Sequence, residues 1–337
     1  MNANLHTSTG RSPFTLPKNT FFKHFARCAS AATLAAFLQF PAFSSCTRWE
    51  ALPDEGDSPI YIHCTKAPAP EAIDLFFFDT LGMQRLDSYQ QIIPSGAPVY
   101  GLSRSGARRI VALSGKSGET GLWSGISHYG VLRKHLFCLA EESAGAPLLY
   151  GQGVVAPGAS RITTLELSPL LAAVRLRSVS CDFSGRPYEG ESFYNHKLFL
   201  TFAGSESLPL GDADTRTLSW INPGFLDSTA VMALKEPSLL LQNGVGEVGS
   251  SRIYPQRDFY CYEGAPTHLV LEGQVGEVFC FYPIRLTGLR EGFCLQLDVT
   301  LRRMGSSRAD IPAESGAIIV KTDIVPWECP EPATIAF

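Results

Sequence analysis

The stretch FCLQLDVTL, residues 293–301, alternates apolar and polar side chains along its whole length. Successive side chains of an extended chain point to opposite faces, so the apolar residues of this stretch would share one face. They are Phe293, Leu295, Leu297, Val299 and Leu301, whereas the other face would carry Cys294, Gln296, Asp298 and Thr300. The pattern predicts a half-buried strand of the kind found in antiparallel β-sandwiches.

Other stretches show the same organisation. VRLR at residues 174–177 alternates in the same way, as do Leu198, Leu200 and Phe202. IDLFFF at residues 73–78 ends at a turn signal, and RIVAL at residues 109–113 lies between two Ser-Gly pairs. Strands do not alternate regularly with helices, so an all-β chain is expected rather than a parallel doubly wound sheet.

One helix is expected, as an insertion in the first half of the chain. Tyr129, Leu132, Leu136 and Leu139 recur at helical spacing. Ser124 or Ser127 would cap the start of this helix, and Gly145 with Pro147 would end the segment. The short helix would pack on a sheet.

A turn-rich break at residues 210–214 (LGDAD) suggests where the chain divides. We expect one antiparallel β-sandwich over residues 60–212 and a second over residues 213–337. Both lengths are ordinary for a sandwich domain.

Composition narrows the class of protein. The 337 residues are 45% hydrophobic and only 18% charged, which excludes a disordered chain and a single small module. The formal net charge of −4 provides no broad basic field for the phosphates of nucleic acid.

The first segment has the pattern of an export signal. No Asp or Glu precedes Glu50, and the apolar run CASAATLAAFLQF at residues 28–40 follows several basic residues. This order predicts a signal peptide over residues 1–45. FSSC at residues 43–46 resembles the lipobox of bacterial lipoproteins, in which the cysteine, here Cys46, becomes the acylated first residue. Plain cleavage without a lipid is the alternative, and residues 46–59 would form an acidic tether.

No motif predicts an enzyme, a cofactor or a metal site. Gly244, Gly246 and Gly249 satisfy a GxGxxG pattern, but Pro255 follows too soon for the helix that a dinucleotide site requires, so a hairpin loop is expected. His63, His128, His135, His196 and His268 form no metal-binding pair, and His128 and His135 would be solvated residues on the surface of the expected helix.

Cysteines and tryptophans leave alternatives open. The cysteines after Cys46 lack CxxC spacing, so small buried hydrophobes are expected, although export would permit a disulfide. Trp123, Trp220 and Trp327 could instead be platforms for a glycan. Exposed tryptophans would favour a surface glycan-binding lipoprotein, and buried ones a subunit of an assembly.

Several stretches together resemble the fimbrillin family of Bacteroidetes, the exported subunits of surface fimbriae. The resemblance is carried by stretches in the order found in that family, over roughly residues 70–328. They are IDLFFFDTLGMQR (73–85), LLYGQG (148–153), LELSPLLAAVRLRSV (165–179), FYCYE (259–263), LVLEG (269–273), FYPIRL (281–286) and IIVKTDIVPWE (318–328).

The resemblance implies two transthyretin-like β-sandwich domains and a structural role in a fimbria. Subunits of the family assemble by β-strand complementation, so the implied partners are other fimbrial subunits and, through a lipid, the outer membrane. Host or bacterial surface ligands are further implied partners. The implied location is the outer membrane or a fimbrium at the cell surface.

Shaft subunits of the family lose their first strand when a protease cuts after a basic residue. Here IYIHCT at residues 60–65 is the expected first strand, so a cut after Lys66 would remove it and a cut after Arg48 would not. No Arg lies between Arg48 and Arg85, and the short stretch after Trp327 contains two prolines, which cannot donate ladder hydrogen bonds. An anchor or tip subunit is therefore expected rather than a shaft subunit.

Overall fold

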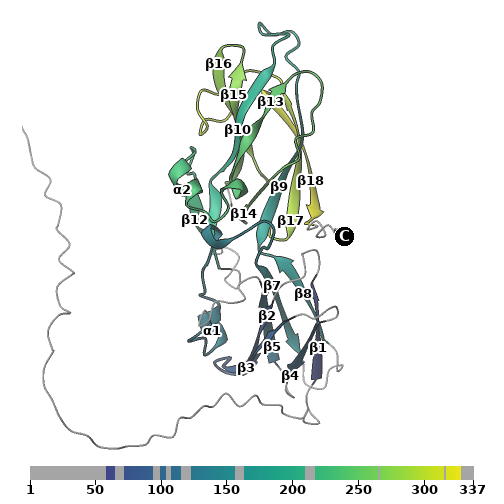
Figure 1. Cartoon of the computed structure of the whole chain (residues 1–337), viewed down its shortest axis with the longest axis vertical. Coiled ribbons are helices and arrows are strands. Elements are labelled where there is room, and N and C mark those ends of the chain that lie inside the picture. The colour runs from purple at the N-terminus through teal and green to yellow at the C-terminus, as the bar shows by residue number, and fades with distance from the viewer. Residues whose placement is uncertain are drawn as a thin grey trace, which may run out of the picture. The chain divides into compact units, whose positions relative to one another are not determined.

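The computed structural model describes residues 58–64, 72–93, 99–103, 108–114, 123–155, 163–208, 217–264, 266–314 and 316–327. All of them belong to one compact unit, Leu52–Phe337. This unit consists almost entirely of β-strands (Figure 1), which confirms the all-β class.

The first group of strands forms two ladders that share β8. Its members are β1 (Ser58–Cys64), β2 (Ile73–Asp79), β3 (Leu86–Ile92), β4 (Val99–Ser103), β5 (Arg108–Ser114), β7 (Leu149–Val155) and β8 (Thr163–Pro169), in the order β3-β2-β5-β7-β8-β1-β4. Only two residue pairs, Leu149 with Pro169 and Tyr150 with Ser168, join β7 to β8. Leu165 and Leu167 of β8 are buried with Ile73, Leu75 and Phe77 of β2, so the two ladders enclose an apolar core.

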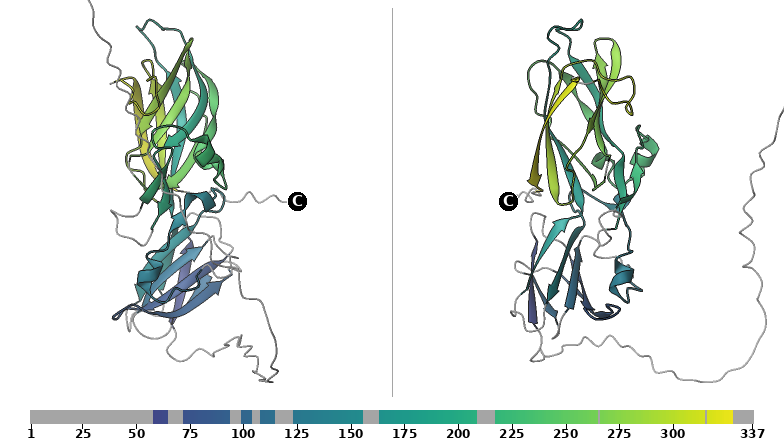
Figure 2. Two further views of the ribbon diagram at one scale, coloured as in Figure 1. Left: turned by 90° about the vertical axis from the view of Figure 1, so that its left-hand side faces the viewer. Right: turned by 180° about the vertical axis from the view of Figure 1, so that it is seen from behind.

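The second group forms two further sheets. One has the order β13-β10-β15-β16, with β13 (Leu241–Val248), β10 (Phe193–Thr201), β15 (His268–Val275) and β16 (Val278–Arg285). The other has the order β12-β11-β14-β9-β17-β18, with β12 (Thr217–Ile221), β11 (Ala203–Ser207), β14 (Arg257–Tyr262), β9 (Leu171–Cys181), β17 (Phe293–Leu301) and β18 (Ile318–Pro326). Figure 2 shows these sheets from two further sides.

A large apolar cluster lies between these two sheets. Leu176 and Val179 of β9 and Leu297 of β17 are buried with Phe193 and Leu198 of β10. Phe293, Leu295, Leu297, Val299 and Leu301 do share one face of β17, and of these only Phe293 is partly exposed. The strands expected at residues 73–78 and 109–113 are confirmed as β2 and β5.

Hydrogen-bonded strand pairs cross the domain boundary that was expected between residues 212 and 213. Strands β9, β10 and β11 precede that point, yet β9 pairs with β14 and β17, and β10 pairs with β13 and β15. Apart from β6, which pairs with β11, the strands up to β8 pair among themselves, and the strands from β9 onward do the same. The turn signal at residues 210–214 lies outside the described residues, between two strands that pair with each other, β11 and β12.

The expected helix is only one turn long. Helix α1 spans Tyr129–Leu132 and has no side-chain cap. The chain then forms β6 (Phe137–Cys138), which pairs with β11, and a 3-10 turn at Leu139–Glu141, because Phe137 and Leu139 enter the core instead of continuing the helical stripe. The sequence reading missed α2 (Ser228–Met232) and the 3-10 turn at Pro237–Leu239. Among the described residues no helix is long and apolar enough to span a membrane.

The segment that contains α1 is bonded to the second group of strands. The Tyr262 hydroxyl donates a hydrogen bond of 2.8 Å to the buried Glu142 carboxylate, whose other oxygen accepts from the Leu148 amide at 3.1 Å. The Lys235 amide donates to the Ala140 carbonyl at 3.0 Å. Burial and the neighbouring Glu142 charge raise the pKa of Tyr262, so this hydroxyl remains a donor at all ordinary pH values.

Gly244 and Gly246 of the GxGxxG pattern are part of strand β13, and Gly249 comes directly after its last residue, so the first two glycines are not in a hairpin loop. Opposite them β10 contains a β-bulge between Asn195 and Lys197. Gly244 lies so close to this bulge that a Cβ atom there would be 2.0 Å from the Asn195 carbonyl oxygen. Gly246 has φ +78°, a conformation that other residues rarely adopt. The two glycines are therefore explained by backbone packing.

We expect Gly244→Ala to lower the free energy of unfolding by at least about 2 kcal/mol, because the new methyl group meets backbone atoms that cannot rotate away. Gly145→Ala is the matched control, since nothing lies within 4 Å of a Cβ atom at that position, and its effect should stay within about 0.5 kcal/mol. Urea unfolding of both variants checks this. Equal effects would contradict the proposed role of Gly244.

Candidate functional site: the first strand and the outer sheet faces

The residues proposed for processing lie outside the described part of the chain. Cys46, Arg48 and Lys66 are all in segments that the structure does not describe, so their roles stay predictions. The strand expected between Arg48 and Lys66 is present as β1, and it ends two residues before Lys66.

Strand β1 holds a central place in its ladder. It pairs with β8 in parallel, from Ile60 with Thr163 to Cys64 with Leu167, and with β4 antiparallel, from Ser58 with Ser103 to Ile62 with Val99. Residues Leu165 and Leu167 of β8, which register with β1, are buried. Without β1, the strands β8 and β4 would each lose a row of main-chain partners, and an unpaired row of this kind is a template for another strand.

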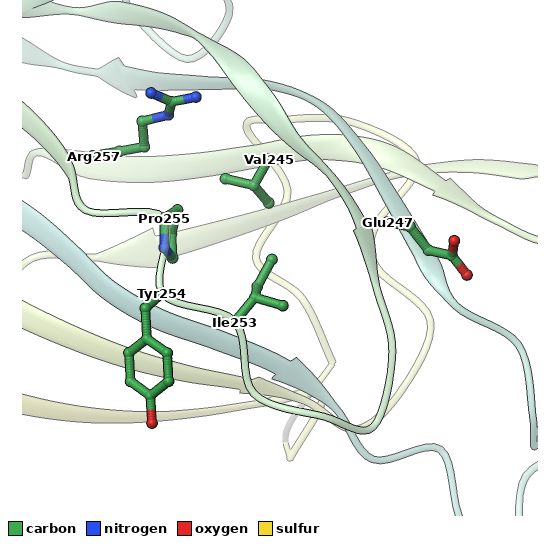
Figure 3. Close-up of a pocket in the computed structure, with 6 residues that line it drawn as sticks. All are labelled: Val245, Glu247, Ile253, Tyr254, Pro255 and Arg257. Atoms are coloured by element: carbon green, nitrogen blue, oxygen red, sulfur yellow. The ribbon is translucent and has the colours of Figure 1, made fainter.

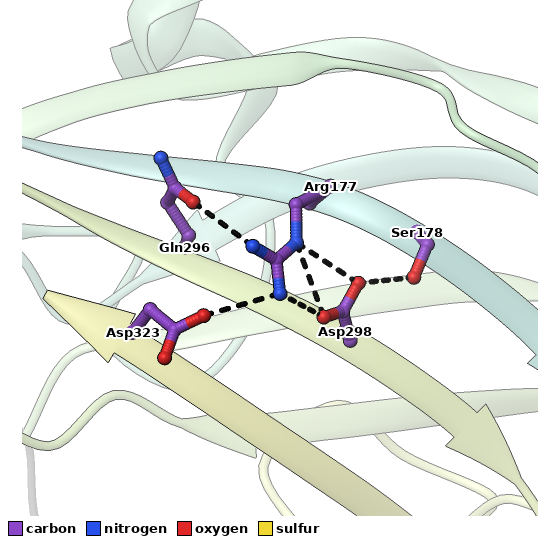
Figure 4. Close-up of polar contacts among 5 residues, drawn as sticks. All are labelled: Arg177, Ser178, Gln296, Asp298 and Asp323. Atoms are coloured by element: carbon purple, nitrogen blue, oxygen red, sulfur yellow. Dashed lines mark hydrogen bonds and ion pairs between the residues drawn. The ribbon is translucent and has the colours of Figure 1, made fainter. Parts of the chain in front are cut away.

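The outer face of the β14-β9-β17-β18 sheet carries a charged network (Figure 4). Arg177 donates hydrogen bonds from Nε to both Asp298 oxygens, at 3.2 and 3.1 Å, and from Nη1 to the Gln296 side-chain oxygen at 3.3 Å. The Ser178 hydroxyl also donates to Asp298, and Asp323 forms an ion pair of 3.2 Å with Arg177. Beside it, Arg175 and Asp258 form a two-pronged pair with both distances 2.7 Å. Each of these charged side chains is paired with one of opposite charge on another strand of the sheet, which is typical of a structural sheet surface.

Asp298 is the titratable centre of this network. Its hydrogen bond from Arg177 and then that from Ser178 lower the pKa of the carboxyl to about 2, against the opposing effect of burial. A lowered pKa in the folded state means that the ionised carboxylate stabilises the fold above the ordinary Asp pKa. This stabilisation is lost as the pH falls from about 4 to about 2.

A shallow recess lies beside β13. It is about 310 Å³ in volume, and its lining residues are Val245, Glu247, Ile253, Tyr254, Pro255 and Arg257. Figure 3 shows Arg257 and Glu247 at opposite ends of this recess, so the two charged groups do not converge on one point. The recess therefore offers no arrangement for acid–base catalysis.

The tryptophans do not form one platform. Trp327 is buried, and its ring lies 5.0 Å from that of Tyr260 at a tilt of 31°. Trp123 is partly buried, and its indole nitrogen donates to Asp74 at 3.0 Å. Trp220, on the edge strand β12, is 45% exposed. Of these three, Trp220 alone has the exposure that a glycan platform requires.

The histidines are placed differently from the expectation. His135 lies outside α1, and its ring is 5.0 Å from Trp123 and 4.9 Å from Phe137, so it packs among aromatic rings instead of standing in solvent. The short helix is the reason, because the chain has already turned towards β6 at this position. No group of three His, Cys, Asp or Glu residues that could hold a metal occurs within the described ranges.

Most of the described cysteines behave as small buried hydrophobes. Burial raises the pKa of Cys181 and Cys294 to about 11 and that of Cys261 to about 12, so these thiols stay protonated at neutral pH. Cys181, Cys261, Cys280 and Cys294 are free, buried thiols, whereas Cys138 is partly exposed.

We expect Asp298→Asn to lower the free energy of unfolding at pH 7 by about 1–2 kcal/mol, because the charge that Arg177 binds is removed. The free energy of unfolding of this variant should also decrease less between pH 4 and pH 2 than that of the original protein, since position 298 no longer titrates. The matched control is Asp323→Asn, whose side chain is 61% exposed and contacts the same Arg177. That change should cost less than about 0.5 kcal/mol. Chemical unfolding across this pH range checks both, and an unchanged pH profile in Asp298→Asn would contradict the role of Asp298.

The comparisons with known proteins concern the fold. No protein-family model and no curated protein sequence matches the chain. Among solved structures, the chain is similar to a fimbrilin from Porphyromonas gingivalis W83, with a TM-score of 0.56 and 13% identity over 81% of this chain and 98% of that one. It is also similar to a provisionally assigned cell adhesion protein from Bacteroides eggerthii, with a TM-score of 0.59 and 18% identity over 81% of this chain and 96% of that one. A provisionally assigned cell adhesion protein from Parabacteroides distasonis has a TM-score of 0.56 and 12% identity over 80% of this chain and 96% of that one. The chain therefore has the fold of Bacteroidetes fimbrilins and adhesion proteins, which confirms at the level of the fold the resemblance to the fimbrillin family.

Proposed function

We propose that this protein is a structural subunit of a cell-surface fimbria and that it assembles by β-strand complementation. The observation that carries the proposal is the pairing of β1, which lies between β8 and β4 in a protein whose fold matches a fimbrilin. The similar structures named above are fimbrial and adhesion proteins, which supports a role without catalysis.

Strand complementation follows from what β1 contributes. Main-chain hydrogen bonds supply the affinity of an added strand, and alternate side chains supply its specificity. The buried Leu165 and Leu167 beside β1 mean that loss of this strand would uncover apolar surface as well as main-chain groups. A strand of another subunit would cover both. The two strand groups would then correspond to the two transthyretin-like sandwiches that the resemblance implies.

Membrane attachment is proposed through Cys46. Acylation there would place the expected acidic tether, residues 46–59, next to the outer membrane, and the last two tether residues, Ser58 and Pro59, belong to β1. More than one acyl chain would be needed for lasting attachment, since a single chain binds only marginally.

An anchor or tip role is proposed in preference to a shaft role. No arginine lies between Arg48 and Arg85, so a cut by an arginine-specific protease would either leave β1 in place or separate both β1 and β2 from the rest of the chain. A subunit that keeps β1 would have no vacancy for the strand of a neighbour at this ladder, so it would stand at one end of a fibre and could accept a strand there only after β1 leaves.

We expect native protein isolated from cell envelopes to begin at a lipid-modified Cys46, with β1 still present. N-terminal sequencing and intact mass check this. Cys46→Ser should move the protein out of the membrane fraction, whereas Cys138→Ser, at a partly exposed cysteine, should not. Full-length protein found in long homopolymers would contradict the anchor or tip role.

A pair of truncated chains tests strand complementation itself. A chain that starts at Trp49 keeps β1 and should remain monomeric, whereas a chain that starts at Ala67 lacks it and should polymerise or bind a synthetic peptide of residues 58–64. Size-exclusion chromatography with light scattering and peptide titration check this. If the two chains behave alike, or if the shorter one neither polymerises nor binds the peptide, the proposal fails.

A further inference from the structure

The outer faces of the two sheets in the second strand group differ in chemistry. On the β14-β9-β17-β18 sheet, outward positions carry the charge pairs described above, as expected for a surface in solvent. On the β13-β10-β15-β16 sheet, Tyr194 and His196 of β10 and Phe279 and Phe281 of β16 occupy the outward positions. We call these four residues the aromatic face. Tyr194 is 53% exposed and Phe279 is 45% exposed, and exposed apolar residues that lie together mark a candidate interaction site.

The four rings form one continuous row that runs along β10, crosses β15 and continues along β16. The Tyr194 ring lies 5.0 Å from His196, which lies 6.3 Å from Phe279, and Phe279 lies 5.3 Å from Phe281. The rings of His196 and Phe279 are inclined by only 30°, whereas the two outer pairs meet edge to face. This row brings together residues about 85 positions apart in the chain.

Polar groups are interleaved with the rings. Gln274 of β15 lies in register between Tyr194 and Phe279, and Glu247 of β13 registers on the other side of Tyr194. In the next row, Lys197 and Glu272 form an ion pair of 3.4 Å beside Phe281. The face thus offers amide, carboxylate and ammonium groups at the spacing of neighbouring strands.

The backbone beneath the aromatic face is firmly held. The buried Asn195 side chain donates to the carbonyls of Lys197 and Glu272, at 3.0 and 2.9 Å, and accepts from the Val245 amide at 3.0 Å. These bonds fix the bulge that presents Tyr194, His196 and Lys197 outward. The hairpin from β15 to β16 turns at Gly276, with φ +57°, and sets Phe279 opposite Gln274.

We propose that the aromatic face binds a neutral saccharide chain. The apolar C–H faces of sugar rings pack on aromatic rings, while their hydroxyl groups need donors and acceptors of the kind that Gln274, Glu272 and Lys197 provide. A second copy or another protein fits this face less well, because the core of a protein interface is depleted in Lys and Glu. The carboxylates of Glu247 and Glu272 would repel a polyanionic glycan. The inference does not depend on fimbrial assembly.

The test uses the purified full chain in native gels that contain hydroxyethyl cellulose, mannan or xylan. Migration should be retarded by at least one of these three neutral polysaccharides. The double variant Tyr194→Ala/Phe279→Ala should weaken binding at least tenfold, as measured by calorimetric titration, because it removes two exposed rings of the row, one on each strand. Tyr194→Phe keeps the ring and should stay within threefold of the original affinity.

The matched control is Trp220→Ala/Phe225→Ala, which removes two exposed rings, 45% and 61% exposed, outside the aromatic face. It should leave retardation unchanged. Four outcomes would overturn the proposal: no retardation by any of the three polysaccharides, retardation that survives the Tyr194→Ala/Phe279→Ala change, loss of binding in the control variant, or a dimer in sedimentation that this double change dissociates. All variants alter exposed side chains, and thermal unfolding verifies that each remains folded.

Discussion

The parallel pairing of β9 with β17 is the contact on which the larger strand group depends. It joins segments more than 100 residues apart, from Cys294 with Ala173 to Leu301 with Cys181. On its inner side, Leu176 and Leu297 belong to the main apolar core. On its outer side, Arg177 of β9 and Asp298 of β17 hold the same two strands together through ionised groups. β14 pairs with β9 and β18 with β17, so the order of the sheet follows from this one ladder.

The proposed partners would meet two different kinds of surface on this protein. Around β1, the interacting groups would be the main-chain donors and acceptors of β8 and β4, which any extended segment of suitable length and side-chain pattern can satisfy. On the aromatic face, the interacting groups are side chains fixed on a rigid sheet. Assembly through the first and adhesion through the second would use separate residues. A fimbrial subunit could therefore bind a ligand without disturbing its place in the fibre.

The polar groups of the described sheets mostly satisfy one another. Arg175 pairs with Asp258, Arg177 with Asp298, and Lys197 with Glu272, while Tyr262 donates to the buried Glu142. The buried thiols of Cys181, Cys261 and Cys294 are protonated at neutral pH. These features stabilise a structure and supply no activated nucleophile. They are in keeping with a subunit whose function lies in its surfaces.

Local pattern determined which segments became strands, because alternation and turn residues act over a few positions. The strands β2, β5 and β17 follow from such signals, whereas the first strand at β1 was expected from the resemblance to the fimbrillin family. Tertiary structure decided what each strand pairs with, since partners lie far away in sequence: β9 to β11 join the later strands, across the boundary expected after residue 212. Tertiary packing also ends α1 after Leu132, because Phe137 and Leu139 enter the core. It likewise places Gly244 in a strand that packs against the bulge at Asn195. The aromatic face could not be predicted from the sequence for the same reason, because Tyr194 and Phe279 become neighbours only when β15 pairs with both β10 and β16.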